Sequence, residues 1–84
     1  MKDTSRLRVV RAWKAGNPED GRAGWCVEFR FDKAGVTRLK RLIPPAERMW
    51  DDTAKVWWIS ADYLPEACRV APALEAITGQ EKLL

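Results

Sequence analysis

The segment from residue 25 to residue 31 alternates large apolar and polar residues without interruption, the pattern of a strand with one buried face. Its apolar side carries Trp25, Val27, Phe29 and Phe31. Four large groups on one side of a strand require a second layer to cover them. A first strand is predicted at residues 7–14, joined to this one by a polar loop at 15–24 that is rich in turn-forming residues.

A helix is predicted directly after the alternating strand. Asp32 is a good N-cap, because its carboxylate can accept hydrogen bonds from the unpaired N–H groups of the first turn. Val36, Leu39 and Ile43 recur at helical spacing and form one apolar stripe. The helix must end before Pro44-Pro45, since a residue that precedes proline is pushed out of the α conformation.

A second hairpin and a second helical region complete the chain. Residues 48–51 and 55–60 are predicted to be its two strands. The last segment is helical but interrupted: Asp62 is a predicted cap, Pro72 either kinks the helix or starts another, and Gly79 is a predicted C-cap. The order ββαββα indicates one α+β domain over residues 1–84, with a four-stranded, mainly antiparallel sheet and helices packed on one face.

Strand parity divides the aromatic residues between the two faces of this sheet. With a two-residue turn at Asp52-Thr53, Trp50 lies across from Lys55. The face toward the helices then carries Trp50, Trp57 and Ile59, and the other carries Met49, Val56 and Trp58. We therefore assign five aromatic residues to the core: Trp25, Phe29, Phe31, Trp50 and Trp57.

Trp58 is left without an evident cover, because its neighbours Trp57 and Ile59 already occupy the inner face. An exposed indole can stack against a nucleic-acid base, so Trp58 is the predicted functional aromatic residue. The alternative is that Trp58 covers a second small cluster with Met49 and Val56.

Trp13 is ambiguous by the same reasoning. It shares strand parity with the apolar Leu7 and Val9, but also with Arg11. A β-bulge near Val9-Val10 resolves the conflict, because one extra residue in a strand reverses the parity of everything after it.

The charge of the chain is unevenly distributed. Residues 1–50 carry 12 Lys and Arg against 6 Asp and Glu, whereas residues 51–84 carry 3 against 6. A basic portion on a small domain suggests a positive surface for a polyanion. The chain has no histidine, which removes the commonest general base and metal ligand, and no phosphate-binding glycine motif. We expect no enzymatic activity, no metal and no cofactor.

The chain shows no sign of a membrane or of secretion. No apolar run follows the N-terminal Met1 to Arg6, which indicates that there is no signal peptide. No stretch reaches the roughly 18 apolar residues that a membrane span requires. Cys26 and Cys68 are far apart and are predicted to be buried thiols in a reducing compartment. These features predict a cytoplasmic protein, with a monomer favoured.

The stretch at about residues 25–65 resembles the HARP domain that accompanies annealing helicases and related small phage and bacterial domains. The resemblance rests on the aromatic-Asp pair Trp50-Asp51, the basic Lys55, Trp57 and the pair Asp62-Tyr63. It implies a DNA-binding module for single-stranded or fork DNA that assists a helicase or another replication or repair protein. Trp58 departs from the family pattern, in which such strands usually place a smaller or polar residue outward. The chain is then either a domain of a larger helicase or a free-standing relative.

The predicted nucleic-acid site combines basic residues with the outward indole. Its members are Arg6, Arg8, Lys14, Arg22, Arg30, Lys40, Arg41, Arg48, Lys55 and Trp58. Cations on such a surface displace counterions from phosphates, and arginine favours planar contacts. A protein-interaction adaptor or inhibitor is the rival interpretation, because an exposed Trp beside arginines is also typical of an interface hot spot.

Overall fold

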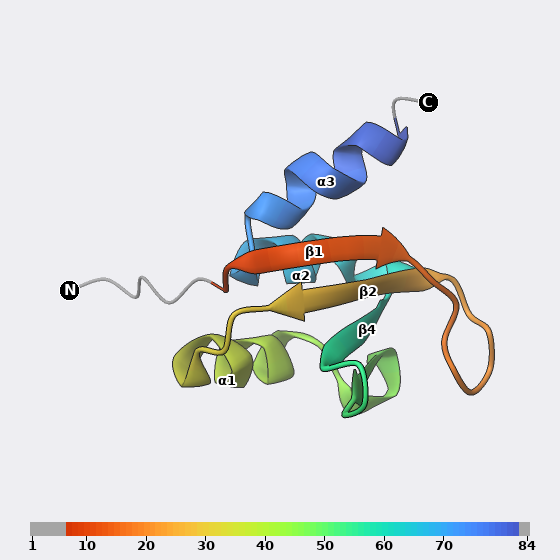
Figure 1. Cartoon of the computed structure of the whole chain (residues 1–84), viewed down its shortest axis with the longest axis horizontal. Coiled ribbons are helices and arrows are strands. Elements are labelled where there is room, and N and C mark those ends of the chain that lie inside the picture. The colour runs from red at the N-terminus through yellow and green to blue at the C-terminus, as the bar shows by residue number, and fades with distance from the viewer. Residues whose placement is uncertain (1–6, 83–84) are drawn as a thin grey trace.

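The computed structural model describes residues 7–82 and has the α+β fold that the sequence predicts. The sheet has four antiparallel strands in the order β1-β2-β4-β3. The strands are β1 (Val9–Lys14), β2 (Gly24–Phe29), β3 (Arg48–Asp51) and β4 (Val56–Ser60). The helices are α1 (Lys33–Leu42), α2 (Leu64–Val70) and α3 (Ala73–Lys82), with short 3-10 turns η1 (Pro45–Glu47) and η2 (Ala61–Tyr63). Figure 1 shows α2 behind the sheet, with α3 above β1 and α1 below β2.

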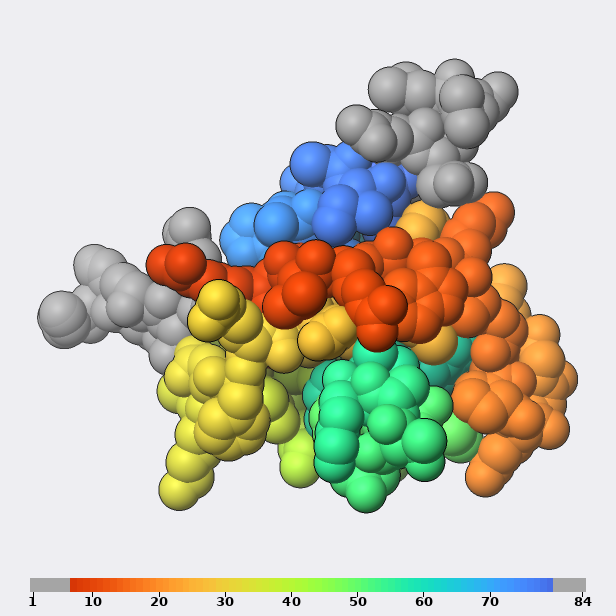
Figure 2. Space-filling model, in the orientation of Figure 1, coloured from red at the N-terminus to blue at the C-terminus, as the bar shows by residue number. Residues whose placement is uncertain are grey.

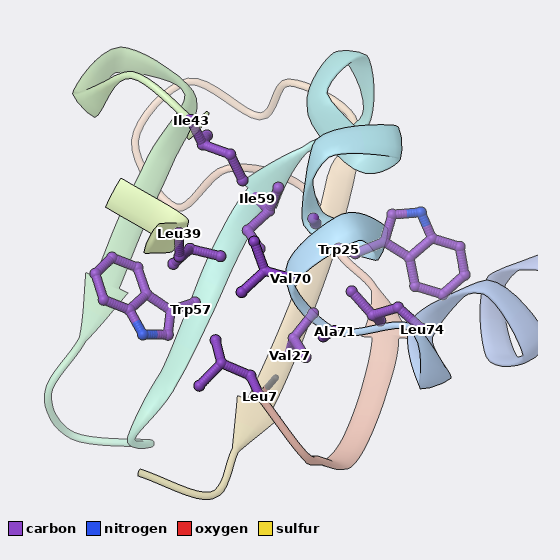
Figure 3. Packing of buried hydrophobic residues seen from close by; sticks show 11 residues of the cluster. Leu7, Trp25, Val27, Leu39, Ile43, Trp57, Ile59, Val70, Ala71 and Leu74 are labelled. Atoms are coloured by element: carbon purple, nitrogen blue, oxygen red, sulfur yellow. The ribbon is translucent and has the colours of Figure 1, made fainter. Parts of the chain in front are cut away.

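The hydrophobic core lies between one face of the sheet and the helices. Leu39 from α1, Val70 from α2 and Leu74 from α3 are fully buried in it. In Figure 3, Trp57 lies near Leu39 at one end of the core, and Trp25 lies near Leu74 at the other. Both indoles are buried, as strand parity predicts. Two large aromatic residues at opposite ends therefore fill the space that three short helices leave.

Leu7 joins the core because α1 comes very close to it at Gly35. A Cβ atom on Gly35 would lie 2.6 Å from the Leu7 Cδ2 atom, well inside contact distance. Gly35 is a poor helix former, and its place in the first turn of α1 follows from this close approach. Asp32 stands at the N-cap of α1, but its carboxylate makes no capping hydrogen bond. Only its backbone carbonyl accepts from the Val36 N–H, at 2.9 Å.

The pairing of β3 with β4 differs from the sequence prediction by two residues. Trp50 pairs with Trp57, not with Lys55. The connection is a four-residue loop because the Asp51 carboxylate accepts hydrogen bonds from the backbone N–H groups of Thr53 and Ala54, each at 3.0 Å. Lys55 closes the loop with a positive φ of 61°. A shift of two residues preserves parity, so the faces assigned to these tryptophans are correct.

Two element ends also differ from the prediction. β2 stops at Phe29, so Phe31 is not in the core and its side chain is 82% exposed. Gly79 does not end the last helix, since α3 continues to Lys82. Pro72 precedes α3 and separates it from α2, which is one of the two predicted outcomes. Asp62 is not a cap, because the Ser60 hydroxyl accepts from the Asp62 N–H instead.

The predicted bulge in β1 is present. Val9 pairs with Phe29 and Arg11 pairs with Glu28, so Val10 is the extra residue. After the bulge, Arg11 and Trp13 share the face of the sheet that points away from the helices, which we call the outer face. The Arg11 guanidinium lies 4.9 Å from the centre of the Trp13 ring.

Candidate nucleic-acid interface

Trp58 is buried, and its predicted role as an exposed stacking residue is wrong. Its side chain is 1% exposed, although it lies on the outer face. The loop at 15–24 folds back over it: the indole N–H donates to the Ala15 carbonyl at 3.0 Å, and Gly24 packs directly on the ring. Figure 2 shows this loop, in orange, against the surface formed by the β3–β4 hairpin, in green and teal. Val56 is buried beside it, as in the alternative of a second cluster.

Arg22 is held in this cover by other residues of the domain. Its guanidinium bonds Asp20 at 3.0 Å and Glu47 at 3.1 Å, and it also donates to the Ala46 carbonyl at 2.7 Å. The hydrogen bond to Glu47 raises the pKa of Arg22 above its usual value. The same group lies 5.5 Å from the centre of the Trp58 ring. Arg22 therefore ties the loop to η1, and each of its three guanidinium nitrogens donates a hydrogen bond within the domain.

Two further predicted cations have partners within the domain. Arg48 donates to the Ile43 carbonyl at 2.8 Å and lies 5.9 Å from the centre of the Trp57 ring. Lys55 pairs with Asp52 at 3.1 Å. The structure therefore gives both residues a local role in fixing the β3–β4 hairpin.

The remaining predicted cations fall in three places. Lys14 lines a wide, shallow depression of about 840 Å³ beside Trp25 and α2. Arg8 and Arg30 are neighbours at the end of the β1–β2 pair, where the Arg30 N–H donates to the Arg8 carbonyl at 2.9 Å. Lys40 and Arg41 are exposed in the last turn of α1. Arg6 lies outside the described residues.

Lys40 stands at the rim of an open apolar groove of about 320 Å³. The groove lies between α1 and the sheet, and its walls come from β2, the β2–α1 connection, α1, β3 and β4. The lining residues are Phe29, Phe31, Val36, Lys40, Trp50 and Trp57. Among the side chains of residues 7–79, no ion pair involves Lys40, so its ammonium is available to a ligand. We call these six residues the aromatic groove.

Trp50 supplies the exposed edge of the aromatic groove. Its side chain is 44% exposed, and its ring centre lies 5.3 Å from that of the buried Trp57, with the planes tilted by 54°. The Trp50 N–H donates to the Asp52 carboxylate at 3.3 Å, which fixes the ring from the turn. Hydrogen bonds from Lys55 and Trp50 lower the pKa of Asp52. Trp50 is thus partly open to solvent but restrained in its orientation.

Phe31 and Trp50 are the exposed aromatic residues that the sequence prediction assigned to the core. Phe31 follows the last residue of β2 and precedes α1, so it lies beyond the surface that the helices cover. Trp50 belongs to β3, an edge strand, and α1 does not cover it fully. The available signals were the position of Phe31 beside the predicted cap Asp32 and the shortness of the third strand.

Helix α1 adds positive charge next to the aromatic groove. It contains four basic residues and no acidic residue: Lys33, Arg38, Lys40 and Arg41. Such a helix raises the local concentration of an anionic ligand near the aromatic rings. Exposed rings with adjacent cations are the features that single-stranded nucleic acids recognise.

No family model matches this chain, and its comparison with curated proteins and with solved structures gives no match either. The part of the chain that the structure describes has no group of three or more Cys, Asp or Glu side chains that could hold a metal ion. Within the same residues, none of the helices has both the length and the apolar composition to cross a bilayer.

Proposed function

We propose that this domain is a non-catalytic module that binds single-stranded DNA in the aromatic groove. The observation that carries the proposal is the convergence of two exposed aromatic rings, Phe31 and Trp50, with the unpaired Lys40 ammonium on one groove. Bases would stack on the rings, and Lys40 and Arg41 would contact phosphates. The resemblance of residues 25–65 to HARP domains supports DNA as the ligand and a helicase or a replication or repair protein as the associated machinery.

The energies of such contacts are large enough for a small module. Stacking of one base on an exposed ring contributes about 1–3 kcal/mol, and the groove offers two such rings. Each phosphate neutralised on a single strand contributes about 0.7 to the slope of log affinity against log salt concentration. Duplex DNA presents no unstacked bases to the rings. Single strands should therefore bind more tightly than a duplex of equal length.

The test is the binding of fluorescently labelled single-stranded, forked and duplex DNA at several salt concentrations. Trp50→Ala should weaken single-strand binding by roughly tenfold, the value of one stacked base. Trp13→Ala is the matched control, because Trp13 is 38% exposed but lies on the outer face. Its affinity should stay within about twofold of the wild type. Binding that is absent at low salt, insensitive to salt or unaffected by Trp50→Ala would refute the proposal.

A second candidate is the docking of a protein partner in the same groove. The observation that favours it is the Phe31 side chain, whose 82% exposure next to an apolar groove fits an interface anchor. Charge reversal separates the two functions. Lys40→Glu with Arg41→Glu should abolish DNA binding, whereas an apolar docking site centred on Phe31 would keep its partner. Lys14→Glu with Arg69→Glu, two exposed residues beside the depression near α2, makes the same change of net charge and is the matched control.

A further inference from the structure

Arg8 and Arg30 form a pair of like charges at the end of the sheet. They lie directly across from each other in the extension of β1 and β2, where the backbone bond between them continues the ladder beyond Val9 and Phe29. Because strand residues alternate between faces and Val9 and Phe29 pack against the core, both arginines belong to the outer face. Opposed residues in such a pair have Cβ atoms roughly 4.5–5.5 Å apart.

No carboxylate relieves this repulsion among the residues that the structure describes. Glu28 precedes Arg30 by two residues on the outer face, and it is engaged by Arg11 at 2.6 Å. Asp32 is the N-cap residue of α1, and its carboxylate lies beside Gly35. Two opposed guanidiniums without a counterion are destabilising in the isolated protein and favourable around an anion. Arg8 and Arg30 therefore have the chemistry to hold a phosphate between them, and we call this pair the arginine clamp.

The segment that carries Arg30 also contributes to the aromatic groove. Phe29 and Phe31 line the groove, and Arg30 stands between them in the sequence. The short segment from Phe29 to Phe31 thus carries groove residues and a clamp residue. A chain that leaves the groove past the exposed Phe31 reaches the clamp by rounding the end of the sheet.

We infer that one nucleic-acid strand occupies both places, with bases in the aromatic groove and its continuing phosphates between Arg8 and Arg30. This inference rests on the proposed function. It adds a second contact on the other face of the sheet and a path between the two contacts. Only a flexible single strand can follow that path. Duplex DNA is stiff over about 150 base pairs, so it cannot bend around the end of a single sheet from one face to the other.

The path predicts that the arginine clamp acts only on oligonucleotides long enough to reach it. The experiment compares oligothymidylates of about four and about sixteen nucleotides, the range of footprints seen in small single-strand-binding folds. The variant Arg8→Gln/Arg30→Gln should bind the short oligonucleotide as the wild type does. It should bind the long one roughly tenfold more weakly, with a salt slope smaller by about 1.4, or 0.7 for each lost phosphate contact.

The matched control is Lys14→Gln/Arg69→Gln, which removes the same charge beside the wide depression near α2. It should change the two affinities equally and by less than about twofold. An Arg8→Gln/Arg30→Gln variant that weakens both lengths alike, or neither, overturns the inference and leaves the proposed function standing. Wild-type protein that binds no oligonucleotide of either length overturns both.

Discussion

Replacement of Trp58 by phenylalanine separates a structural indole from a binding indole. Trp58 is covered by the loop at 15–24, which contributes the Ala15 carbonyl as acceptor, the Arg22 guanidinium over the ring and the Gly24 backbone against it. Phenylalanine keeps an apolar ring but removes the N–H donor and part of the volume. We expect Trp58→Phe to lower the free energy of unfolding without weakening DNA binding.

The expected loss of stability is about 3 kcal/mol. The hydrogen bond to Ala15 contributes about 1 kcal/mol net. Phenylalanine is smaller than tryptophan by about three ring atoms, and at about 0.8 kcal/mol for each buried carbon group this costs roughly 2 kcal/mol more. For a domain of this size, 1 kcal/mol shifts the Tm by about 4–8 °C, so the Tm should fall by between about 10 and 25 °C. A domain with an ordinary stability of about 5–15 kcal/mol remains folded in the cold after this loss.

The assay is thermal unfolding followed by circular dichroism, together with DNA binding at a temperature where Trp58→Phe is folded. Trp50→Ala is the complementary variant: its Tm should fall much less, because Trp50 is 44% exposed, while its affinity for DNA falls. A Tm within about 3 °C of the wild type for Trp58→Phe would contradict the account of the loop as a cover. Lost binding by a folded Trp58→Phe protein would restore the sequence-based assignment.

Gly35→Ala should destabilise the domain although alanine is the better helix former, because its Cβ would meet Leu7 at 2.6 Å. Urea denaturation should show a smaller loss for Gly35→Ala in a Leu7→Ala background, and equal losses would argue against the clash. Gly79→Ala, inside α3 with no atom near the added Cβ, should raise stability by about 0.5–1 kcal/mol in the same assay, and a decrease would contradict the helical assignment there. Burial raises the pKa of the Cys26 thiol above its usual 9.0, and the negative charge of Asp51 makes a smaller contribution in the same direction. Because the folded protein holds that proton more tightly, the associated stability is complete below pH 9 and is lost as the pH rises through the folded-state pKa. Peptide mass spectrometry should show Cys26 alkylated more slowly in the folded chain than in the unfolded chain at pH 8, and equal rates would count against this.

Strand parity gave the reliable part of the fold. The period of two places Trp25 and Trp57 on the inner face, and it tolerates a pairing error of two residues, so the true partner of Trp50 did not matter. The bulge at Val10 followed from the same rule, since Arg11 could not share a buried face with Val9. These features depend on local alternation, which the sequence displays directly.

The candidate site depended on tertiary contacts that alternation does not encode. The loop at 15–24 is polar, and its sequence does not reveal that it folds over Trp58. Phe31 continues the alternation of β2, but the strand ends two residues earlier, before the chain turns into α1. Trp50 has the inward parity, yet it lies at an edge that the helices do not reach. Phe31 and Trp50, which were predicted to be in the core, are therefore exposed, and Trp58, which was predicted to be exposed, is buried.

The most direct measurement is an N–H correlation spectrum of the isotope-labelled protein titrated with an oligothymidylate. The chain has five tryptophans, and each indole N–H gives its own signal. We expect the Trp50 indole signal to shift during the titration, together with the backbone signals of Phe31 and Lys40, while the Trp58 indole signal stays in place. Shifts confined to Trp13 or Trp58, with the Trp50 signal unmoved at saturating DNA, would contradict binding in the aromatic groove.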